Sequence, residues 1–201
     1  MKQRIAAVIL AAGMSSRMGQ QKLLLPLGGK PLLSYVLSLV HDKIWADSIV
    51  IIGQPEDELA ELCRHYNLRS VYNANRQNGQ ATSIALAMQQ LQGEFDGFMF
   101  FMGDQPLLSP ALIEAVLIQF AQMADNRYVI VPCYQGQRYS PVLFGSHWQA
   151  DLAALAGDTG GRQIMRKNPE WVHELAWPDA GPFYDADTWE EYQEMRKLVE
   201  E

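Results

Sequence analysis

The chain has 201 residues, of which 48% are hydrophobic and 19% charged. This length and apolar content fit one globular domain over residues 1–201 and exclude general disorder. The 16 basic and 23 acidic residues give a formal charge of −7, which argues against a nucleic acid as the partner. A small anionic ligand is compatible with this charge, because a few local cations and backbone amides can hold a phosphate.

The longest apolar stretch, residues 5–14, is much shorter than the roughly 18 residues that indicate a membrane-spanning helix. We therefore expect no membrane segment. Basic residues precede the stretch and small residues end it, which also resembles a short signal peptide. We favour a buried strand that leads into a glycine turn. The two cysteines, Cys63 and Cys133, are far apart in the sequence, and we expect reduced thiols in a cytoplasmic protein.

Short apolar runs alternate with longer amphipathic stretches from residue 4 to residue 144, which predicts a parallel sheet covered by helices. We expect strands at 5–10, 48–52, 69–72, 97–102, 128–132 and 141–144, and a weaker one at 171–175. We expect helices at 31–41, 56–65, 81–91, 110–123, 147–156, 160–167 and 188–199. The helix at 110–123 has the clearest start, because Ser109 can cap it and Pro110 suits the first helical position.

The first predicted strand runs into a loop, residues 13–22, that combines glycines and small polar residues with Arg17 and Lys22. Parallel sheets bind ligands beyond the carboxyl ends of their strands. Amides of this loop could turn toward a polyphosphate while the two cations neutralise it. The spacing fits neither a P-loop nor a dinucleotide fingerprint. An ordinary polar loop with solvated cations accounts for the spacing equally well.

The fourth predicted strand ends in Gly103-Asp104-Gln105-Pro106, so one carboxylate lies just past a wholly apolar strand. Asp104 could bind a Mg²⁺ ion that bridges to a triphosphate, although Asp-Gln-Pro also favours a turn by itself. Asp185 and Asp187 precede the last predicted helix and could share this metal if that helix returns to the sheet edge. Asp187 or Thr188 could instead simply cap the helix.

Several short motifs follow one another along the chain. The first is Leu10-Ala11-Ala12-Gly13, followed by Arg17-Met18-Gly19 and Lys22-Leu23. The others are Pro-Leu-Gly-Gly-Lys-Pro at 26–31, Asn78-Gly79 with Ser83, Gly-Asp-Gln-Pro at 103–106, Pro-Val-Leu-Phe at 141–144, Gly-Asp-Thr-Gly-Gly-Arg at 157–162 and Asp-Ala-Asp-Thr at 185–188. Together they resemble the MobA-like nucleotidyltransferases over nearly the full length. The Ala-Ala-Gly form and the motifs at 26–31 and 103–106 resemble the molybdenum cofactor cytidylyltransferases more than the guanylyl branch.

The resemblance implies a Rossmann-like three-layer α/β/α fold with a mostly parallel mixed sheet, of the nucleotide-diphospho-sugar transferase type. It implies transfer of CMP from CTP to the terminal phosphate of molybdopterin, with Mg²⁺ as the cofactor and pyrophosphate released. A molybdenum hydroxylase apoenzyme would then be the partner that receives the product.

The resemblance also implies roles for individual residues. Arg17 and Lys22 would hold the triphosphate and act in catalysis with Asp104, which would bind Mg²⁺. The other residues would bind the nucleotide (Leu10, Ala11, Ala12, Gly13, Gly79 and Ser83), the metal (Asp185 and Asp187) or the acceptor (Arg138, Pro141 and Arg162). The family usually has Gly and His after the arginine at 138, where this chain has Tyr139 and Ser140. This departure concerns the acceptor and leaves the nucleotide loop unchanged.

Three alternatives stay open. One is a nucleotidyltransferase for another phosphorylated acceptor, such as a sugar phosphate or methylerythritol phosphate. The second is guanylyl transfer from GTP to molybdopterin, and the third is a maturation protein that binds the molybdenum cofactor without catalysing transfer. A NAD-binding module fits less well, because the acidic ribose ligand expected about 20 residues past the glycine loop is not evident.

Overall fold

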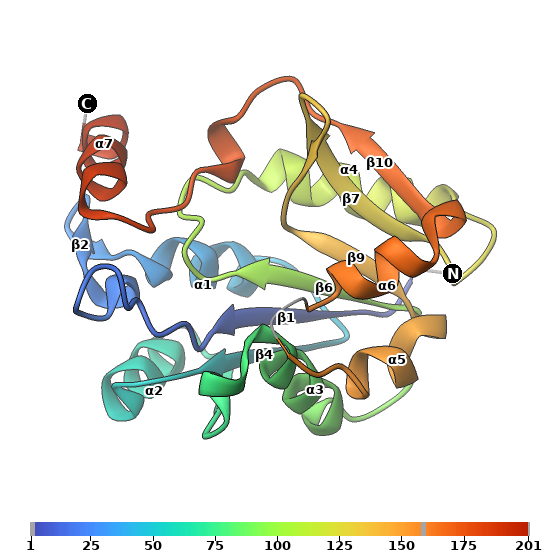
Figure 1. The fold of residues 1–201 in the computed structure, drawn as a ribbon, viewed down its shortest axis with the longest axis horizontal. Coiled ribbons are helices and arrows are strands. Elements are labelled where there is room, and N and C mark those ends of the chain that lie inside the picture. Colours follow the sequence, from blue (N-terminus) through green and yellow to red (C-terminus); the bar gives the residue numbers. More distant parts are fainter. Residues whose placement is uncertain (1–2, 158–159, 201) are drawn as a thin grey trace.

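A mixed sheet forms the centre of the protein in the computed structural model, which describes residues 3–157 and 160–200. Its strand order is β10-β7-β9-β6-β1-β4-β5, and the short strand β8 pairs with β7. The strands are β1 Ile5–Ala11, β4 Asp47–Ile52, β5 Arg69–Tyr72, β6 Gly97–Met102, β7 Val129–Tyr134, β8 Gln137–Arg138, β9 Val142–Gly145 and β10 Val172–Ala176. β1 runs parallel to β4 and β6, whereas β9 is antiparallel to β6 and β7. The expected mostly parallel mixed sheet is confirmed (Figure 1).

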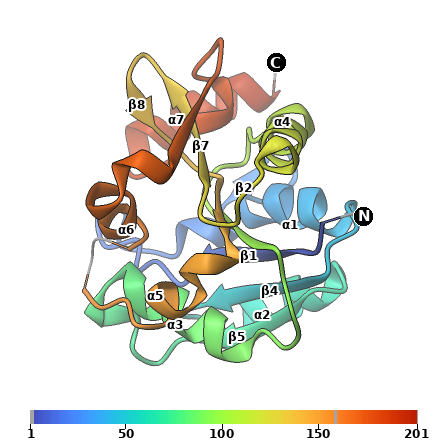
Figure 2. The same cartoon turned by 90° about the vertical axis from the view of Figure 1, so that its right-hand side faces the viewer.

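Helices cover both faces of the sheet and complete the three layers (Figure 2). They are α1 Leu33–His41, α2 Glu56–His65 and α4 Pro110–Gln122 on one face, and α3 Gln80–Gln90, α5 Gln149–Ala153 and α6 Arg162–Lys167 on the other. All seven residues of β1 are buried, and alternate side chains enter the two apolar cores because successive residues of a strand point to opposite faces. No helix of the described part of the chain is long and apolar enough to cross a membrane.

The predicted strands and helices are found, and one helix needs correction. The range 147–156 is a short 3₁₀ turn, Ser146–Trp148, followed by α5, which ends at Ala153. Beyond this helix, the Gly157 carbonyl accepts a hydrogen bond of 3.2 Å from the Ala81 amide at the start of α3, which ties the following segment to α3. The sequence pattern also missed β8 and the hairpin of β2 Pro26–Leu27 and β3 Lys30–Pro31, which are too short to show periodicity.

This hairpin positions the last helix, α7 Trp189–Glu200. Gly28 and Gly29 turn the hairpin with φ of +54° and +83°. A Cβ atom on Gly28 would lie 2.7 Å from the Tyr35 hydroxyl oxygen and 2.9 Å from Val199 Cγ1, so only glycine allows α7 to pack this closely. The Tyr192 hydroxyl of α7 also donates a hydrogen bond to the Pro26 carbonyl. α7 therefore brings the segment at 185–187 back toward the carboxyl ends of β1 and β6 (Figure 1).

Candidate functional site

The loop after β1 is held in shape by Gln21. Its Nε2 atom donates to the carbonyl oxygens of Gly13, at 3.2 Å, and Gln54, at 2.8 Å. Its Oε1 atom accepts from the Ser15 hydroxyl at 3.0 Å and from the Leu23 amide at 3.3 Å. Gln21 thus ties both ends of the loop together and fastens the loop to the chain beyond β4. Sequence reasoning missed this residue, because a single glutamine carries no spacing signal.

Lys22 lies between two carboxylates at the end of this loop. Its Nζ atom is 2.6 Å from Asp104 Oδ2 and 2.7 Å from Asp187 Oδ1, and Arg17 Nη1 is 2.9 Å from Asp187 Oδ2. We call these four residues the charge cluster. The Lys22 side chain is 9% exposed and the Arg17 side chain 68%. The cluster joins residues from three distant parts of the sequence, at the sheet edge where a parallel sheet binds ligands.

The start of α7 leaves Asp187 available to the cluster. Thr188 caps the helix, because its hydroxyl accepts a hydrogen bond of 3.2 Å from the Glu191 amide, while the Glu191 carboxylate accepts one of 2.8 Å from the Thr188 amide. This reciprocal pair is a capping box. Of the two caps considered from the sequence, Thr188 is therefore the one formed, and the Asp187 side chain contacts the two cations instead.

Mutual attraction favours the ionised forms of Lys22 and Asp187. Burial lowers the pKa of Lys22, but the negative charges of Asp104 and Asp187 outweigh burial, so the pKa lies above its usual value. The hydrogen bond from Lys22 lowers the pKa of Asp187. The pKa of Asp185 is raised by partial burial of its carboxyl and by the charges of Asp104 and Asp187 nearby. A cation placed among these three carboxylates would relieve this repulsion.

The three carboxylates meet closely enough to share a metal ion. One oxygen each from Asp104, Asp185 and Asp187 lies within 4.8 Å of the others. The sequence-based condition that the last helix returns to the sheet edge is thus met. Oxygen ligands of this kind suit hard divalent cations such as Mg²⁺.

The predicted nucleotide residues lie in two places, at the end of β1 and at the start of α3. Leu10, Ala11 and Ala12 are buried at the carboxyl end of β1. Gly79 has a φ of +94° and directly precedes α3. Ser83, one turn into the helix, is 5% exposed, and its hydroxyl accepts a hydrogen bond of 2.9 Å from Asn73 Nδ2.

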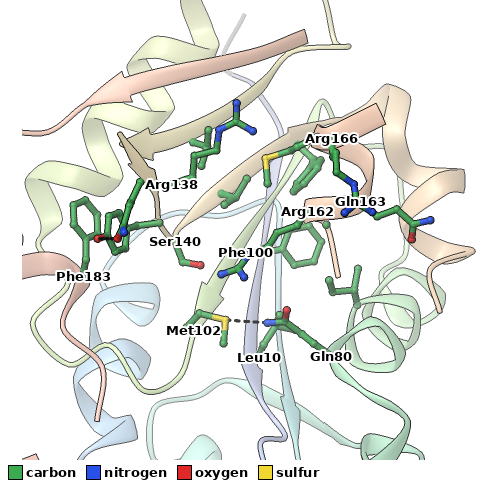
Figure 3. Close-up of a pocket in the computed structure, with 18 of the residues that line it drawn as sticks. Leu10, Gln80, Phe100, Met102, Arg138, Ser140, Arg162, Gln163, Arg166 and Phe183 are labelled. Carbon is green, nitrogen blue, oxygen red and sulfur yellow. Dashed lines mark hydrogen bonds between the residues drawn. The ribbon is translucent and has the colours of Figure 1, made fainter. Parts of the chain in front are cut away.

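A cavity of about 970 Å³ opens beside the cluster. Two of the three predicted acceptor-binding residues line it. Arg138 and Arg162 line it, together with Asp185, whereas Pro141 is buried. Figure 3 shows Phe183 and Ser140 on one side of the cavity and Gln163 on the other. In the motif at 157–162, Asp158 and Thr159 lie outside the described residues.

The family model for the MobA-like NTP transferase domain matches residues 7–173. The chain belongs to the MobA-like NTP transferase family. It is accordingly a nucleotidyltransferase by family, and the resemblance seen in the motifs is confirmed. The match includes the loop after β1, Asp104 and the residues that line the cavity up to Pro169, and it ends before Asp185 and Asp187.

Several relatives of this MobA-like protein are known. The purine catabolism protein PucB of Bacillus subtilis (strain 168) is 28% identical over 206 residues, which cover 97% of each chain. A probable molybdenum cofactor guanylyltransferase of Natranaerobius thermophilus is 29% identical over 147 residues, or 73% of this chain and 68% of that protein. A crystal structure of an Rv0371c homologue from Mycobacterium sp. strain JC1 superimposes with a TM-score of 0.84 at 26% identity, covering 99% of this chain and 98% of that one. The expected fold is thus shared with solved relatives.

Proposed function

We propose that this MobA-like protein is a Mg²⁺-dependent cytidylyltransferase that transfers CMP from CTP to the terminal phosphate of molybdopterin and releases pyrophosphate. The charge cluster carries the proposal. Lys22 lies between Asp104 and Asp187, with Arg17 beside them, so cations suited to a triphosphate adjoin carboxylates suited to a metal. Both meet at the carboxyl ends of β1 and β6, where this type of sheet binds ligands.

The carboxylates of Asp104, Asp185 and Asp187 would hold the metal, since their oxygens lie within 4.8 Å of one another. A bound Mg²⁺ would supply positive charge that offsets the negative charge of the phosphates. Partial burial and the negative charges of Asp104 and Asp187 raise the pKa of Asp185, and a bound cation would offset this repulsion.

The protein's own contribution is alignment and charge neutralisation. An oxygen of the acceptor phosphate attacks the α-phosphorus of CTP, and the bond from this phosphorus to the oxygen bridging to the β-phosphate breaks. Lys22 and Arg17 exchange their carboxylate partners for phosphate oxygens and neutralise the departing pyrophosphate. The acceptor phosphate is already an anionic nucleophile, so the protein needs no general base.

The two substrates would occupy different parts of the site. Residues 10–13 at the end of β1, with Gly79 and Ser83 near the start of α3, would surround the nucleotide. Arg138 and Arg162 line the large cavity and would bind the acceptor, with Pro141 shaping the segment between them. The Ala-Ala-Gly form of the first motif supports CTP as the donor.

Guanylyl transfer from GTP is the second candidate. It is favoured by the Natranaerobius thermophilus relative, whose name is probable molybdenum cofactor guanylyltransferase. The acceptor would be the same, and the difference would lie in the nucleotide side of the site. We further propose a molybdenum hydroxylase apoenzyme as the recipient of the product, which is consistent with a relative named for purine catabolism.

The first test is a thermal-shift screen of CTP, GTP, ATP and UTP, each with and without Mg²⁺. We expect the largest rise in melting temperature with CTP and Mg²⁺ together, because a ligand that binds only the folded state stabilises it. The second test measures pyrophosphate release from CTP or GTP with molybdopterin, and with methylerythritol phosphate as the control acceptor. Turnover with GTP alone would replace cytidylyl by guanylyl transfer. Turnover with the control acceptor alone would refute molybdopterin, and nucleotide binding without any turnover would favour a maturation protein.

A further inference from the structure

Gln105 follows Asp104 directly and lines the large cavity. The residue is only 5% exposed. Its side-chain oxygen, Oε1, is buried and has no hydrogen-bond partner in the parts of the chain that the structure describes. Buried polar atoms are nearly always hydrogen-bonded in folded proteins, and an exception points to strain or to a function.

Three other buried side-chain atoms lack a partner within residues 3–157 and 160–200. They belong to Ser34, Arg76 and Trp177, and none of these residues lines the cavity. Gln105 is therefore the described residue that combines an unpartnered buried oxygen with a position on the cavity wall.

We propose that Gln105 is an acceptor-binding residue, whose Oε1 atom accepts a hydrogen bond from an N–H or O–H group of the acceptor. This inference rests on the proposed function. The cavity is lined by residue 10 and by residues from 80 onward, while residues 11–22, which include the predicted triphosphate loop, are not part of its lining. Gln105 shares this lining with Arg138 and Arg162, the predicted acceptor residues, and we therefore assign its partner to the acceptor.

The neutral amide is suited to this position. Asp104 is the preceding residue and Asp185 lines the same cavity, so a third carboxylate here would repel an anionic acceptor. A glutamine oxygen accepts a hydrogen bond without adding charge. Arg138 and Arg162 supply the positive charge that an acceptor phosphate needs, while Gln105 would recognise an uncharged donor group on the rest of the molecule.

The test compares the wild-type protein with Gln105→Met, which keeps the length of the side chain and removes its hydrogen-bonding atoms. We expect the KM for molybdopterin to rise about tenfold, because one hydrogen bond to the acceptor is lost. We expect the KM for CTP with Mg²⁺ to stay within about twofold. Without substrates, the thermal midpoint of Gln105→Met should equal or exceed that of the wild type, since the variant no longer buries an unpartnered oxygen.

Two further variants sharpen the result. Gln105→Glu should raise the KM for molybdopterin more than Gln105→Met does, because it adds a negative charge beside Asp104. Gln122→Met, on the exposed side of α4, is the matched control and should leave all three measurements unchanged.

The outcomes separate this inference from the function on which it rests. If the wild type forms no product from CTP and molybdopterin, the proposed function is refuted and the role of Gln105 with it. If the wild type is active and Gln105→Met keeps its KM for molybdopterin, only the role of Gln105 is refuted. A rise in the KM for CTP alone would also overturn the inference, as would a clear fall in the thermal midpoint, which would mean that Oε1 already has a partner in the free protein.

Discussion

The charge cluster and the cavity beside it differ in how their polar groups are satisfied in the free protein. In the cluster, Lys22 contacts two carboxylates and Arg17 contacts one, all within 3 Å. In the cavity, the side-chain oxygen of Gln105 has no partner among the residues that the structure describes. A ligand of the cluster must therefore exchange partners with groups that are already paired, whereas a ligand of the cavity supplies a partner that is missing.

This difference leads us to expect different binding behaviour on the two sides. The Lys22 ammonium lies between Asp104 and Asp187, the place that a metal ion would take. Mg²⁺ alone would displace the ammonium without offering it a new partner, while a nucleotide brings phosphates that accept Lys22 and Arg17. We therefore expect metal and nucleotide to bind cooperatively, and the acceptor to bind the cavity without such an exchange.

The largest effect is expected from Asp104→Asn. This change weakens the contact to Lys22 and removes one carboxylate from the triad, so we expect turnover to fall by about 10³-fold or more. Pyrophosphate release measures the loss, and circular dichroism checks that the fold persists. Asp151→Asn, on the exposed side of α5, is the control. A variant that kept a tenth of the wild-type turnover would remove Asp104 from the proposed machinery.

Lys22→Met removes the positive charge and leaves the carboxylates in place, so it tests the role of the cation alone. We expect turnover to fall by about 10²-fold to 10³-fold, as for other preorganised charges at a reaction centre. At the same time the nucleotide-free variant should bind Mn²⁺ more tightly than the wild type, because the ammonium no longer competes for Asp104 and Asp187. Electron paramagnetic resonance of free Mn²⁺ measures this affinity, with Lys43→Met as the control. Unchanged or weaker Mn²⁺ binding would show that the Lys22 ammonium does not compete with the metal ion for these carboxylates.

The types of residue at this site could be predicted from the sequence, but their pairing could not. Lys22 and Asp104 each follow a clear buried strand, and the sequence indicated both. Asp187 is 165 residues from Lys22 in the chain. Its place depends on α7 packing against the hairpin at 26–31, where Gly28 admits Val199, and such packing leaves no periodic signal in the sequence.

The fold could be predicted more fully, because most of its helices and strands have a signal in their own stretch of sequence. Ser109 caps α4 as expected, with its hydroxyl accepting from the Leu112 amide at 3.2 Å, and β1 is as apolar as a central parallel strand requires. Gln21, which holds the loop after β1, and Gln105, on the cavity wall, could not be singled out in this way. What distinguishes them is the set of hydrogen bonds that they make or lack in three dimensions.

Arg17→Gln should have a smaller effect than Lys22→Met. The Arg17 side chain is 68% exposed and contacts a single carboxylate, so much of its charge is screened by water in the free protein. We expect the KM for CTP to rise about tenfold, which corresponds to one charge-assisted hydrogen bond. Arg17→Lys should recover part of the loss. If Arg17→Gln reduced turnover as much as Lys22→Met, the solvent exposure of the two side chains would not predict their relative contributions to turnover.

The smallest effect expected is on the pH dependence of stability, where the two regions again differ. The hydrogen bond from Lys22 lowers the pKa of Asp187 in the folded protein. This carboxylate therefore stabilises the fold above its unfolded pKa of about 3.9, and the contribution disappears as the pH falls through the folded value. Asp187→Asn should lower the free energy of unfolding slightly at pH 6 and less at pH 3, because the side chain is 40% exposed and its charge is partly screened.

Urea unfolding at pH 6 and pH 3 measures this difference. Gln105→Met should change the free energy of unfolding by the same amount at both values, since a carboxamide does not titrate in this range. A pH-independent loss for Asp187→Asn would mean that its side chain acts through packing and not through charge. The contrast between a region held by paired charges and a region with an unpartnered amide oxygen would then no longer hold for stability.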